Sequence, residues 1–300
     1  MFLKKSLIII PTKDRSLEIE KLLKRLLKLK INSKKIIVID SSNNNNFLKN
    51  KSLYIKKKIN FFYSTPSISK QRNIGLKFAK KFKKVKYIFF LDDDIHIKDS
   101  SFVRMDEAIK KYNKKNIFAF SFNQKENNYK KDFLEKIKQS NFSKFIGIYH
   151  PSKGRILNSG FQTKINNIKN DTYTEWIPFA AAVCRYENII NKKFDENFTD
   201  YSYLEDIDFS LSIKKKFIVV SKATCSHEKI IERTSFNFGF VEIINRHKIV
   251  FKHKLNKFSF YKMIVLKSLL NFFLIFFKNI FFIRRFSGNL VGIIYIIFFR

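Results

Sequence analysis

Short, uninterrupted apolar runs alternate with helical patterns through the first third of the chain. The runs are Leu7–Ile10, Ile36–Ile39, Ile59–Tyr63 and Tyr87–Leu91. A helical spacing of apolar residues covers Ser16–Lys30, and a second helix is expected from Ser67 or Ser69 to about Phe82. Apolar strands separated by helices are typical of a parallel sheet that is covered on both faces. The sequence therefore predicts an α/β fold with a mostly parallel, Rossmann-like sheet.

Three consecutive aspartates follow the last of these runs. Asp92, Asp93 and Asp94 are adjacent carboxylates in a chain with 60 Lys+Arg and 25 Asp+Glu. They should repel one another unless a divalent cation binds them, because hard cations take carboxylate oxygens as ligands. The carboxyl edge of a parallel sheet is also where open α/β folds bind their ligands. The alternative is an acidic cluster at a helix N-terminus. The triplet favours a site for a metal ion and phosphate.

Net charge and cysteine content limit the class of protein. The formal charge of +35 predicts an anionic partner. Frequent Lys, Asn, Ile and Phe are also typical of AT-rich coding, so the charge alone does not identify nucleic acid. Cys184 and Cys225 form neither a disulfide framework nor a CxxC pair, which fits a reducing compartment. The first apolar run stops at Pro11, too early for a secretory signal. We therefore expect a cytoplasmic protein.

Other motifs occur in a characteristic order along the chain. They are Ile8–Arg15, Val38–Ser42, Lys70–Leu76, Phe90–Asp94, Phe194–Glu196 and Leu204–Asp208. Together they resemble the GT-A-fold glycosyltransferases of family 2, over residues 6 to about 230. The resemblance implies metal-dependent transfer of a sugar from a nucleotide-diphosphate donor to a glycan or lipid-linked acceptor, with inversion. Mn²⁺ or Mg²⁺ would be the cofactor, because a cation stabilises charge on the departing diphosphate.

The resemblance also implies roles for single residues. Asp206 is the candidate general base, and Asp94 and His227 are the candidate metal ligands. The candidate contacts to the nucleotide-sugar donor are Pro11, Thr12, Arg15, Asp40, Arg72, Asn73, Asp92 and Asp93. Trp176 and Glu205 are candidate contacts to the acceptor. Simpler structural roles remain open: a turn cap for Asp40, a solvated helix side chain for Arg72, favourable first-turn charge for Glu205 and Asp208, and a core position for Trp176.

Two other functions compete with sugar transfer. A sugar nucleotidyltransferase would use a similar sheet but usually has a Gly-rich loop after the first strand. Residues Pro11–Arg15 contain no glycine. A basic protein that binds nucleic acid or a membrane surface belongs to a different class. Nucleic-acid binding predicts basic residues gathered on one element, whereas the lysines here spread over nearly every expected helix.

The character of the chain changes after about residue 235. We expect a catalytic domain at residues 1–235 and a helical, basic and apolar appendage at 236–300. Ile264–Ile283 carries a narrow polar stripe of Lys267, Asn271 and Lys278, and the second apolar piece is Leu290–Phe299. The charges leave too short an apolar stretch for a comfortable membrane span.

The predicted role of this appendage is to lie on the inner face of the cell membrane. Its Phe, Leu and Ile side chains would enter the acyl boundary, with the polar stripe at the headgroups. Flanking basic residues would attract anionic lipid; these are Lys257, Lys262, Arg284, Arg285 and Arg300. The alternative is a helical appendage that packs on the catalytic domain or across a dimer.

Overall fold

The computed structural model describes residues 1–299 except 83, 126–149, 199–201, 228–232 and 278. The described residues form two compact units. The first unit contains residues 1–125 and 165–227, and the second contains 150–164 and 233–299. The second unit therefore includes a segment before residue 165 that the sequence assigned to the catalytic domain.

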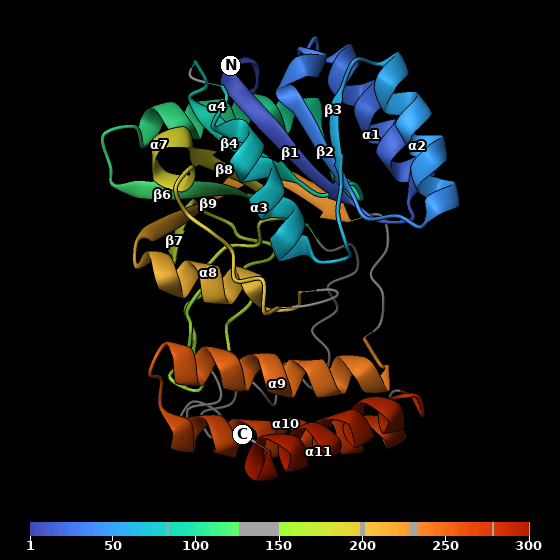
Figure 1. The fold of residues 1–300 in the computed structure, drawn as a ribbon. Coiled ribbons are helices and arrows are strands. Elements are labelled where there is room, and N and C mark those ends of the chain that lie inside the picture. Colours follow the sequence, from blue (N-terminus) through green and yellow to red (C-terminus); the bar gives the residue numbers. More distant parts are fainter. Residues whose placement is uncertain (83, 126–149, 199–201, 228–232, 278, 300) are drawn as a thin grey trace. The chain divides into compact units, whose positions relative to one another are not determined.

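A mixed sheet forms the centre of the first unit (Figure 1). Its strands are β1 (Ser6–Thr12), β2 (Ile36–Asp40), β3 (Asn60–Tyr63), β4 (Tyr87–Leu91), β5 (Ile95–Ile97), β6 (Ile117–Gln124), β7 (Thr172–Thr174), β8 (Ala181–Arg185) and β9 (Lys216–His227). The order across the sheet is β3-β2-β1-β4-β8-β6-β9-β5, with β7 also paired to β9. The strands β1 to β4 pair in parallel, as the sequence predicts.

The second half of the sheet contains antiparallel strand pairs, which the sequence did not predict. Strand β8 lies antiparallel between β4 and β6, and β5 and β7 pair antiparallel with β9. Ala181 begins β8, and Phe179 just before it is buried. Ala182 lies between Phe90 of β4 and Ser121 of β6. A small side chain suits this position because the neighbouring strands carry large aromatic rings.

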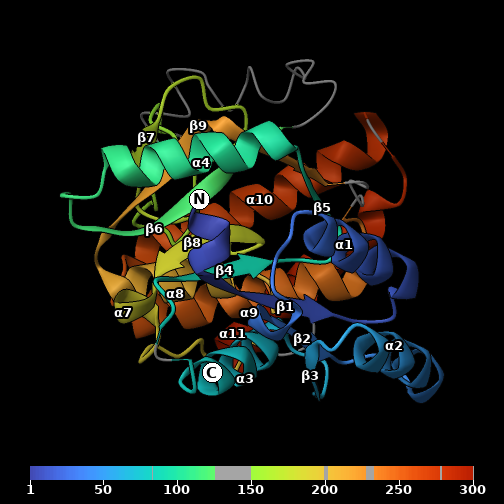
Figure 2. The ribbon, with the colours of Figure 1, turned by 90° about the horizontal axis from the view of Figure 1, so that it is seen from above.

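Helices cover both faces of the sheet, which confirms the α/β class. They are α1 (Ser16–Lys28), α2 (Asn44–Lys56), α3 (Ile68–Ala79), α4 (Asp99–Lys111), α7 (Tyr186–Ile189) and α8 (Glu205–Ile213), with short 3₁₀ turns at Phe2–Lys5 and Ser33–Lys35. Ile8 and Ile10 of β1 pack with α1 and α4, whereas Leu7 and Ile9 pack with α3. Figure 2 shows α4 and α3 on opposite sides of the sheet. Alternate side chains of one strand thus enter two separate cores.

Three helices make up most of the second unit: α9 (Phe236–Lys252), α10 (Lys257–Phe277) and α11 (Phe282–Phe298). Phe161 packs into their core beside Ile243 and Phe260, and Arg246 donates to the Gly160 carbonyl oxygen at 2.9 Å. These contacts explain why the segment before residue 165 belongs to this unit. By length and composition, α10 is the one helix among the described residues that could cross a membrane.

The helical pair α10–α11 differs from the sequence prediction in two ways. Helix α11 has 17 residues, so it is longer than the predicted apolar piece at Leu290–Phe299. Asn271, which was predicted to face lipid headgroups, is completely buried. Its amide Nδ2 donates to Asn289 Oδ1 at 2.5 Å. The polar stripe therefore turns toward other helices, at least at Asn271. Lys278 and Arg300 lie outside the described residues.

Candidate active site

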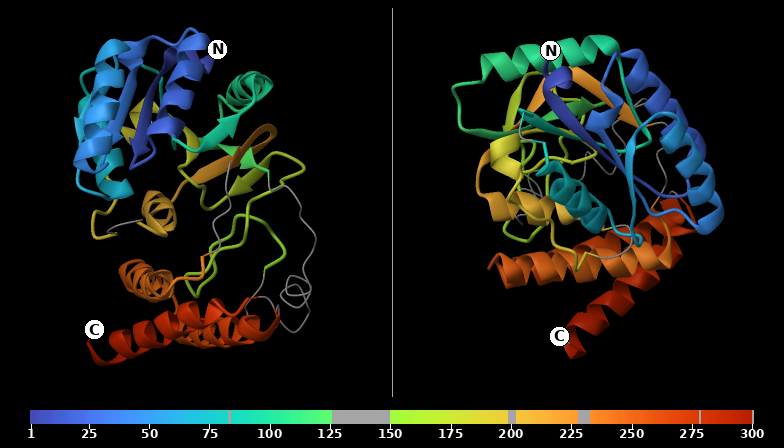
Figure 3. Two further views of the ribbon diagram at one scale, coloured as in Figure 1. Left: turned by 90° about the vertical axis from the view of Figure 1, so that its right-hand side faces the viewer. Right: turned by 45° about the horizontal axis from the view of Figure 1, so that its top comes forward.

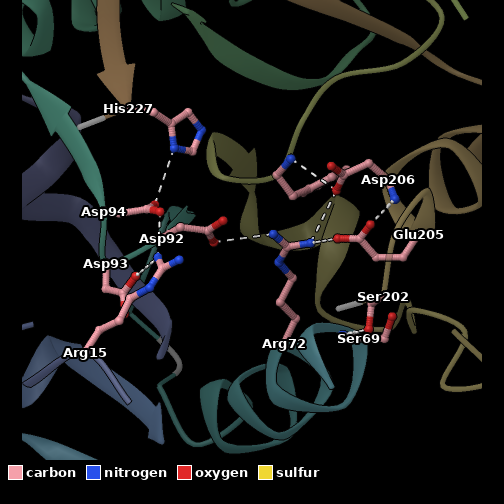
Figure 4. Close-up of polar contacts among 11 residues, drawn as sticks. Arg15, Ser69, Arg72, Asp92, Asp93, Asp94, Ser202, Glu205, Asp206 and His227 are labelled. Atoms are coloured by element: carbon pink, nitrogen blue, oxygen red, sulfur yellow. Dashed lines mark hydrogen bonds and ion pairs between the residues drawn. The ribbon is translucent and has the colours of Figure 1, made fainter. Parts of the chain in front are cut away.

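The acidic triplet forms a tight turn between β4 and β5. The Ile95 amide donates to the Asp92 carbonyl oxygen at 3.3 Å, which closes a four-residue turn. Adjacent side chains of such a turn point in different directions. The three carboxylates therefore meet three different sets of partners, and their mutual repulsion is reduced (Figure 4).

Asp93 is the buried member of the triplet. Thr12 Oγ1, at the end of β1, donates to Asp93 Oδ2 at 2.5 Å. Arg15 Nη1, at the start of α1, donates to Asp93 Oδ1 at 3.0 Å. Asp93 thus joins the ends of two parallel strands and the entry of a helix. Thr12, Arg15 and Asp93 thus brace this edge of the sheet, and their predicted contacts with the donor stay predictions.

Asp94 faces His227, which ends β9. The register pairs Ile95 of β5 with His227 of β9, so the imidazole comes to lie beside the triplet. Asp94 Oδ1 is 3.4 Å from His227 Nδ1, and Asp94 Oδ2 accepts from Arg15 Nη1 at 2.5 Å. The two predicted metal ligands are therefore neighbours, although they lie 133 residues apart in the sequence.

Arg72 of α3 connects the triplet to the acidic start of α8. Its Nη1 contacts Glu205 Oε1 and lies 3.2 Å from Asp206 Oδ1. Its Nη2 lies 3.4 Å from Asp92 Oδ1. The guanidinium also lies 5.4 Å from the ring centre of Phe194, which favours a cation at this position. Figure 4 shows Arg72 reaching from α3 between the two acidic groups.

The backbone before α8 fixes the direction of the acidic side chains. Leu204 has a φ of 75°, a left-handed conformation that costs a leucine on the order of 1–3 kcal/mol. The Phe179 amide donates to Asp206 Oδ1 at 3.2 Å, and the Asp206 amide donates to Glu205 Oε2. Asp206 is therefore held by Arg72 and by the chain that enters β8.

Exposure divides the charged residues into two groups. The side chains of Asp92, Asp94, Asp206 and His227 are between 21% and 27% exposed. The side chains of Arg72, Asp93 and Glu205 are 2% to 6% exposed. The first group can touch a substrate, and the second group supports it. The two oxygens of Glu205 contact Arg72 and the Asp206 amide. An acceptor contact by Glu205 stays a prediction.

Burial and pairing shift several pKa values. Burial raises the pKa of Asp93 to about 7, against the Thr12 hydrogen bond and the Arg15 charge. Burial also raises the pKa of Asp92, against the attraction of Arg72. For Asp94, burial acts in the same direction, but the His227 hydrogen bond and the charges of His227 and Arg15 outweigh it and lower the pKa. Of the three aspartates, Asp94 is thus the one whose surroundings favour the charged carboxylate.

The charges around Arg72 are strongly coupled. Burial lowers the pKa of Arg72, but Glu205 and Asp92 outweigh it and raise the pKa. Burial and the neighbouring Asp206 raise the pKa of Glu205 above its usual range, and Arg72 opposes that rise. Arg72 therefore remains charged and compensates a group of acids that could not be packed together without it.

Two of the predicted donor contacts, Asp40 and Pro11, are buried. Asp40 is completely buried, and its carboxylate accepts from the Ser42 amide, Asn50 Nδ2 and Tyr54 OH at 2.8–2.9 Å. These hydrogen bonds give Asp40 a structural role at the end of β2. Contact between Asp40 and a nucleotide base stays a prediction. Pro11 is buried within β1.

Asn73 and Trp176 also take part in packing. Asn73 Nδ2 donates to the Phe194 carbonyl oxygen, and its Oδ1 accepts from the Phe194 amide, so it anchors that segment to α3. Trp176 packs against the core that contains Phe179, and its Nε1 is buried without a hydrogen-bond partner. An acceptor contact by the Trp176 ring stays a prediction.

Sequence reasoning missed the groups that support this edge of the sheet. Gln71 Nε2 donates to the carbonyl oxygens of Thr12 and Ile39, which ties the ends of β1 and β2 together. Asn50 and Tyr54 lie four residues apart on α2, a helix that the sequence did not predict. The available signal was Asn43, whose side chain caps α2 by accepting from the Asn46 amide at 3.0 Å.

A divalent cation fits Asp94 and His227 as a partial set of ligands. Among the described residues, no three His, Cys, Asp or Glu side chains converge as a complete metal site. Mg²⁺ and related ions on nucleotides usually take one or two protein ligands and complete their shell with phosphate oxygens and water. A carboxylate beside an imidazole meets that requirement, and both are partly exposed.

Comparison with known proteins identifies the family of this chain. The family model described as glycosyl transferase family 2 matches residues 7–184, which is more than half of the chain. Comparison with curated protein sequences gave no match.

A solved structure similar to this chain, that of GalNAc-T7, supports the fold. A crystal structure of GalNAc-T7 with UDP, GalNAc and Mn²⁺ aligns with a TM-score of 0.54 and 13% identity, over 89% of this chain and 57% of that one. The S. aureus TarS structure of residues 1–349 aligns with a TM-score of 0.47 and 14% identity, over 86% of this chain and 69% of that one. The chain thus spans little more than half of the GalNAc-T7 structure. The chain belongs to glycosyl transferase family 2 and is a glycosyltransferase with a GT-A fold.

Proposed function

We propose that the enzyme transfers a sugar from a nucleoside-diphosphate donor to a hydroxyl of a glycan or lipid-linked acceptor, with metal dependence and inversion. One observation carries the proposal. Arg72 joins Asp92 of the triplet to Asp206 at the start of α8 in a single charged network. A leaving-group site and a base site are thus held at a fixed separation by one buried side chain.

The donor diphosphate is assigned to the exposed part of the triplet. Asp94 and His227 would hold Mn²⁺ or Mg²⁺, and Asp92 would orient the donor ribose or a water on the metal. When bound, the cation neutralises charge that develops on the diphosphate. The likeness to GalNAc-T7, whose structure contains UDP and Mn²⁺, supports this assignment. Arg15 would keep Asp94 in place while the diphosphate enters.

Asp206 is proposed as the general base. The acceptor hydroxyl attacks the anomeric carbon, the bond from that carbon to the diphosphate oxygen breaks, and the hydroxyl proton passes to Asp206. A single displacement of this kind inverts the configuration. Asp206 Oδ1 is fixed by Arg72 and the Phe179 amide, so its other oxygen, Oδ2, is the one assigned to the acceptor. Trp176 is proposed to flank the acceptor sugar.

The proposed location is the cytoplasmic face of a membrane. The support is the apolar helix α10 with basic residues before it, together with the formal charge of +35. A lipid-linked acceptor would then be concentrated at the same surface as the enzyme.

A panel of nucleotide sugars tests the proposed reaction. The full chain is incubated with UDP-, dTDP-, GDP- and ADP-linked sugars, with Mn²⁺ or with EDTA. We expect at least one donor to raise the melting temperature and to release its nucleoside diphosphate slowly by hydrolysis in Mn²⁺, because ligand at 100 times its Kd stabilises by about 2.7 kcal/mol. EDTA should remove both effects. Release that persists unchanged in EDTA would contradict metal dependence, and no release from any donor would contradict the donor class.

A further inference from the structure

The helical unit has an apolar core, but unlike a water-soluble helical bundle it also exposes many large apolar side chains. Its buried positions also include polar and small residues. Asn271, Asn289 and Ser268 are at most 3% exposed. Seen in Figure 3, α9 lies on one side of both α10 and α11. The outer surface of that pair therefore needs an apolar environment, since water is an unfavourable one.

Close backbone contacts fill the inside of this bundle. A Cβ added to Gly288 would lie 2.1 Å from the Phe236 carbonyl oxygen, and one added to Gly239 would lie 2.3 Å from that of Arg285. Gly288 and Gly292 are spaced as in the small-residue motif that packs helices within membranes. Asn289 Nδ2 also donates to the Gly239 carbonyl oxygen at 2.9 Å. Polar groups and glycines thus hold α11 against α9.

The exposed apolar side chains are concentrated on α10, α11 and the residues that follow each helix. They are Phe258, Val265, Leu269, Phe272, Phe273, Phe276, Phe277, Ile280, Phe281, Ile283, Leu290, Val291, Ile294, Tyr295, Ile297, Phe298 and Phe299. Phe276 and Phe277 are 69% and 83% exposed. No charged residue occurs at 268–277 or at 286–299. A surface of this extent marks a contact with another apolar phase.

Charged residues lie only at the ends of these stretches. Lys257 and Lys262 are in the first two turns of α10, and Arg284 is near the start of α11. Glu242 of α9 binds Arg246 and Arg285, which keeps the acidic group on the α9 side. The basic residues at the helix ends can bind anionic lipid headgroups, while the uncharged apolar surface contacts the acyl chains.

We infer that α10 and α11 enter the acyl layer of an anionic lipid bilayer as a pair, while α9 stays on the polar side. The inference rests on the membrane location proposed above, and it specifies that the two helices enter as a hairpin whose buried Asn271 and Asn289 bind each other. Lipid is the occupant because the surface combines uncharged aromatic side chains with basic ends. A second copy of this chain would bring the same basic residues together and repel.

Vesicle binding of the full chain tests the inference. The vesicles are equimolar phosphatidylglycerol and phosphatidylcholine. The variant Phe273→Ser/Phe276→Ser/Phe277→Ser should bind at least about tenfold more weakly than the wild type. The control Leu17→Ser/Leu48→Ser/Ile55→Ser changes side chains that are 59–63% exposed on α1 and α2 and should bind like the wild type. Equal vesicle binding by the phenylalanine variant and the wild type would overturn the inference.

A second measurement locates the contact directly and does not depend on the stability of the triple variant. Phe276→Trp is placed in a Trp176→Phe background, so that the protein has one tryptophan. Vesicles with brominated acyl chains should quench its fluorescence, and Leu17→Trp in the same background should not be quenched. No quenching at position 276, or a lipid-free dimer that the phenylalanine variant dissociates, would contradict the lipid assignment. UDP binding by the same preparations shows separately whether the catalytic proposal stands.

Discussion

Replacing Asp206 by asparagine is expected to lower the rate of sugar transfer by about 10²–10⁴-fold. The amide has nearly the same shape but cannot accept the proton of the acceptor hydroxyl. Its Oδ1 can still accept from Arg72 and from the Phe179 amide, so the fold and the donor site should be preserved. Transfer is measured under single-turnover conditions once the panel has identified a donor.

The matched control for this variant is Glu187→Gln. Glu187 is an exposed acid on α7, in the same compact unit but without a contact in the network around Arg72. It should transfer at the rate of the wild type. A rate for Asp206→Asn within a factor of three of the wild type would remove Asp206 from the role of base.

Replacing Arg72 by methionine is expected to lower the free energy of unfolding by about 3–5 kcal/mol. The substitution leaves Glu205, Asp206 and Asp92 without the cation that compensates them, at a position where the Arg72 side chain is only 2% exposed. Trp176 is the single tryptophan and packs in the same unit, so its fluorescence during urea unfolding reports this loss.

Two further variants separate charge compensation from packing. Arg104→Met breaks an ion pair with Glu107 in which both side chains are at least half exposed, and it should cost less than about 1 kcal/mol. Adding Glu205→Gln to Arg72→Met should recover part of the loss, because one uncompensated acid is removed. If Arg72→Met were as stable as Arg104→Met, the charged network around Arg72 would not stabilise the packing of α8 against α3.

The first part of the fold could be predicted because its signal is local. Buried parallel strands are continuous apolar runs, and the sequences of β1, β2 and β4 consist mostly of such runs. Helix α4 also has a local signal, in Phe102, Met105 and Ile109, that was overlooked. Strand β8 had no such signal, because it begins with Ala181 and Ala182 and alanine has little preference for strands.

The sequence motifs named the residues of the candidate site, but they could not predict which residues contact one another. The motifs placed Asp94, Arg72 and Asp206 in the site. That Asp94 meets His227 follows from the pairing of β5 with β9, which is a long-range contact. The contact of Arg72 with Glu205 depends on where α8 begins. The burial of Asn271 could not be predicted either, because its partner Asn289 lies on α11. The polar stripe on α10 shows that one face of the helix is polar, but it does not show what that face contacts.

Calorimetric titration with UDP tests most directly whether the triplet is the metal-dependent donor site. The titration compares the wild type, Asp94→Asn and Asp206→Asn in Mn²⁺ and in EDTA, with Asp99→Asn as an acid control whose side chain is 72% exposed. We predict that Mn²⁺ is required for tight binding, that Asp94→Asn weakens binding at least about tenfold, and that Asp206→Asn and Asp99→Asn bind like the wild type. If Asp94→Asn and Asp206→Asn weakened UDP binding equally, or if UDP bound equally well in EDTA, the triplet would not be the metal-dependent donor site.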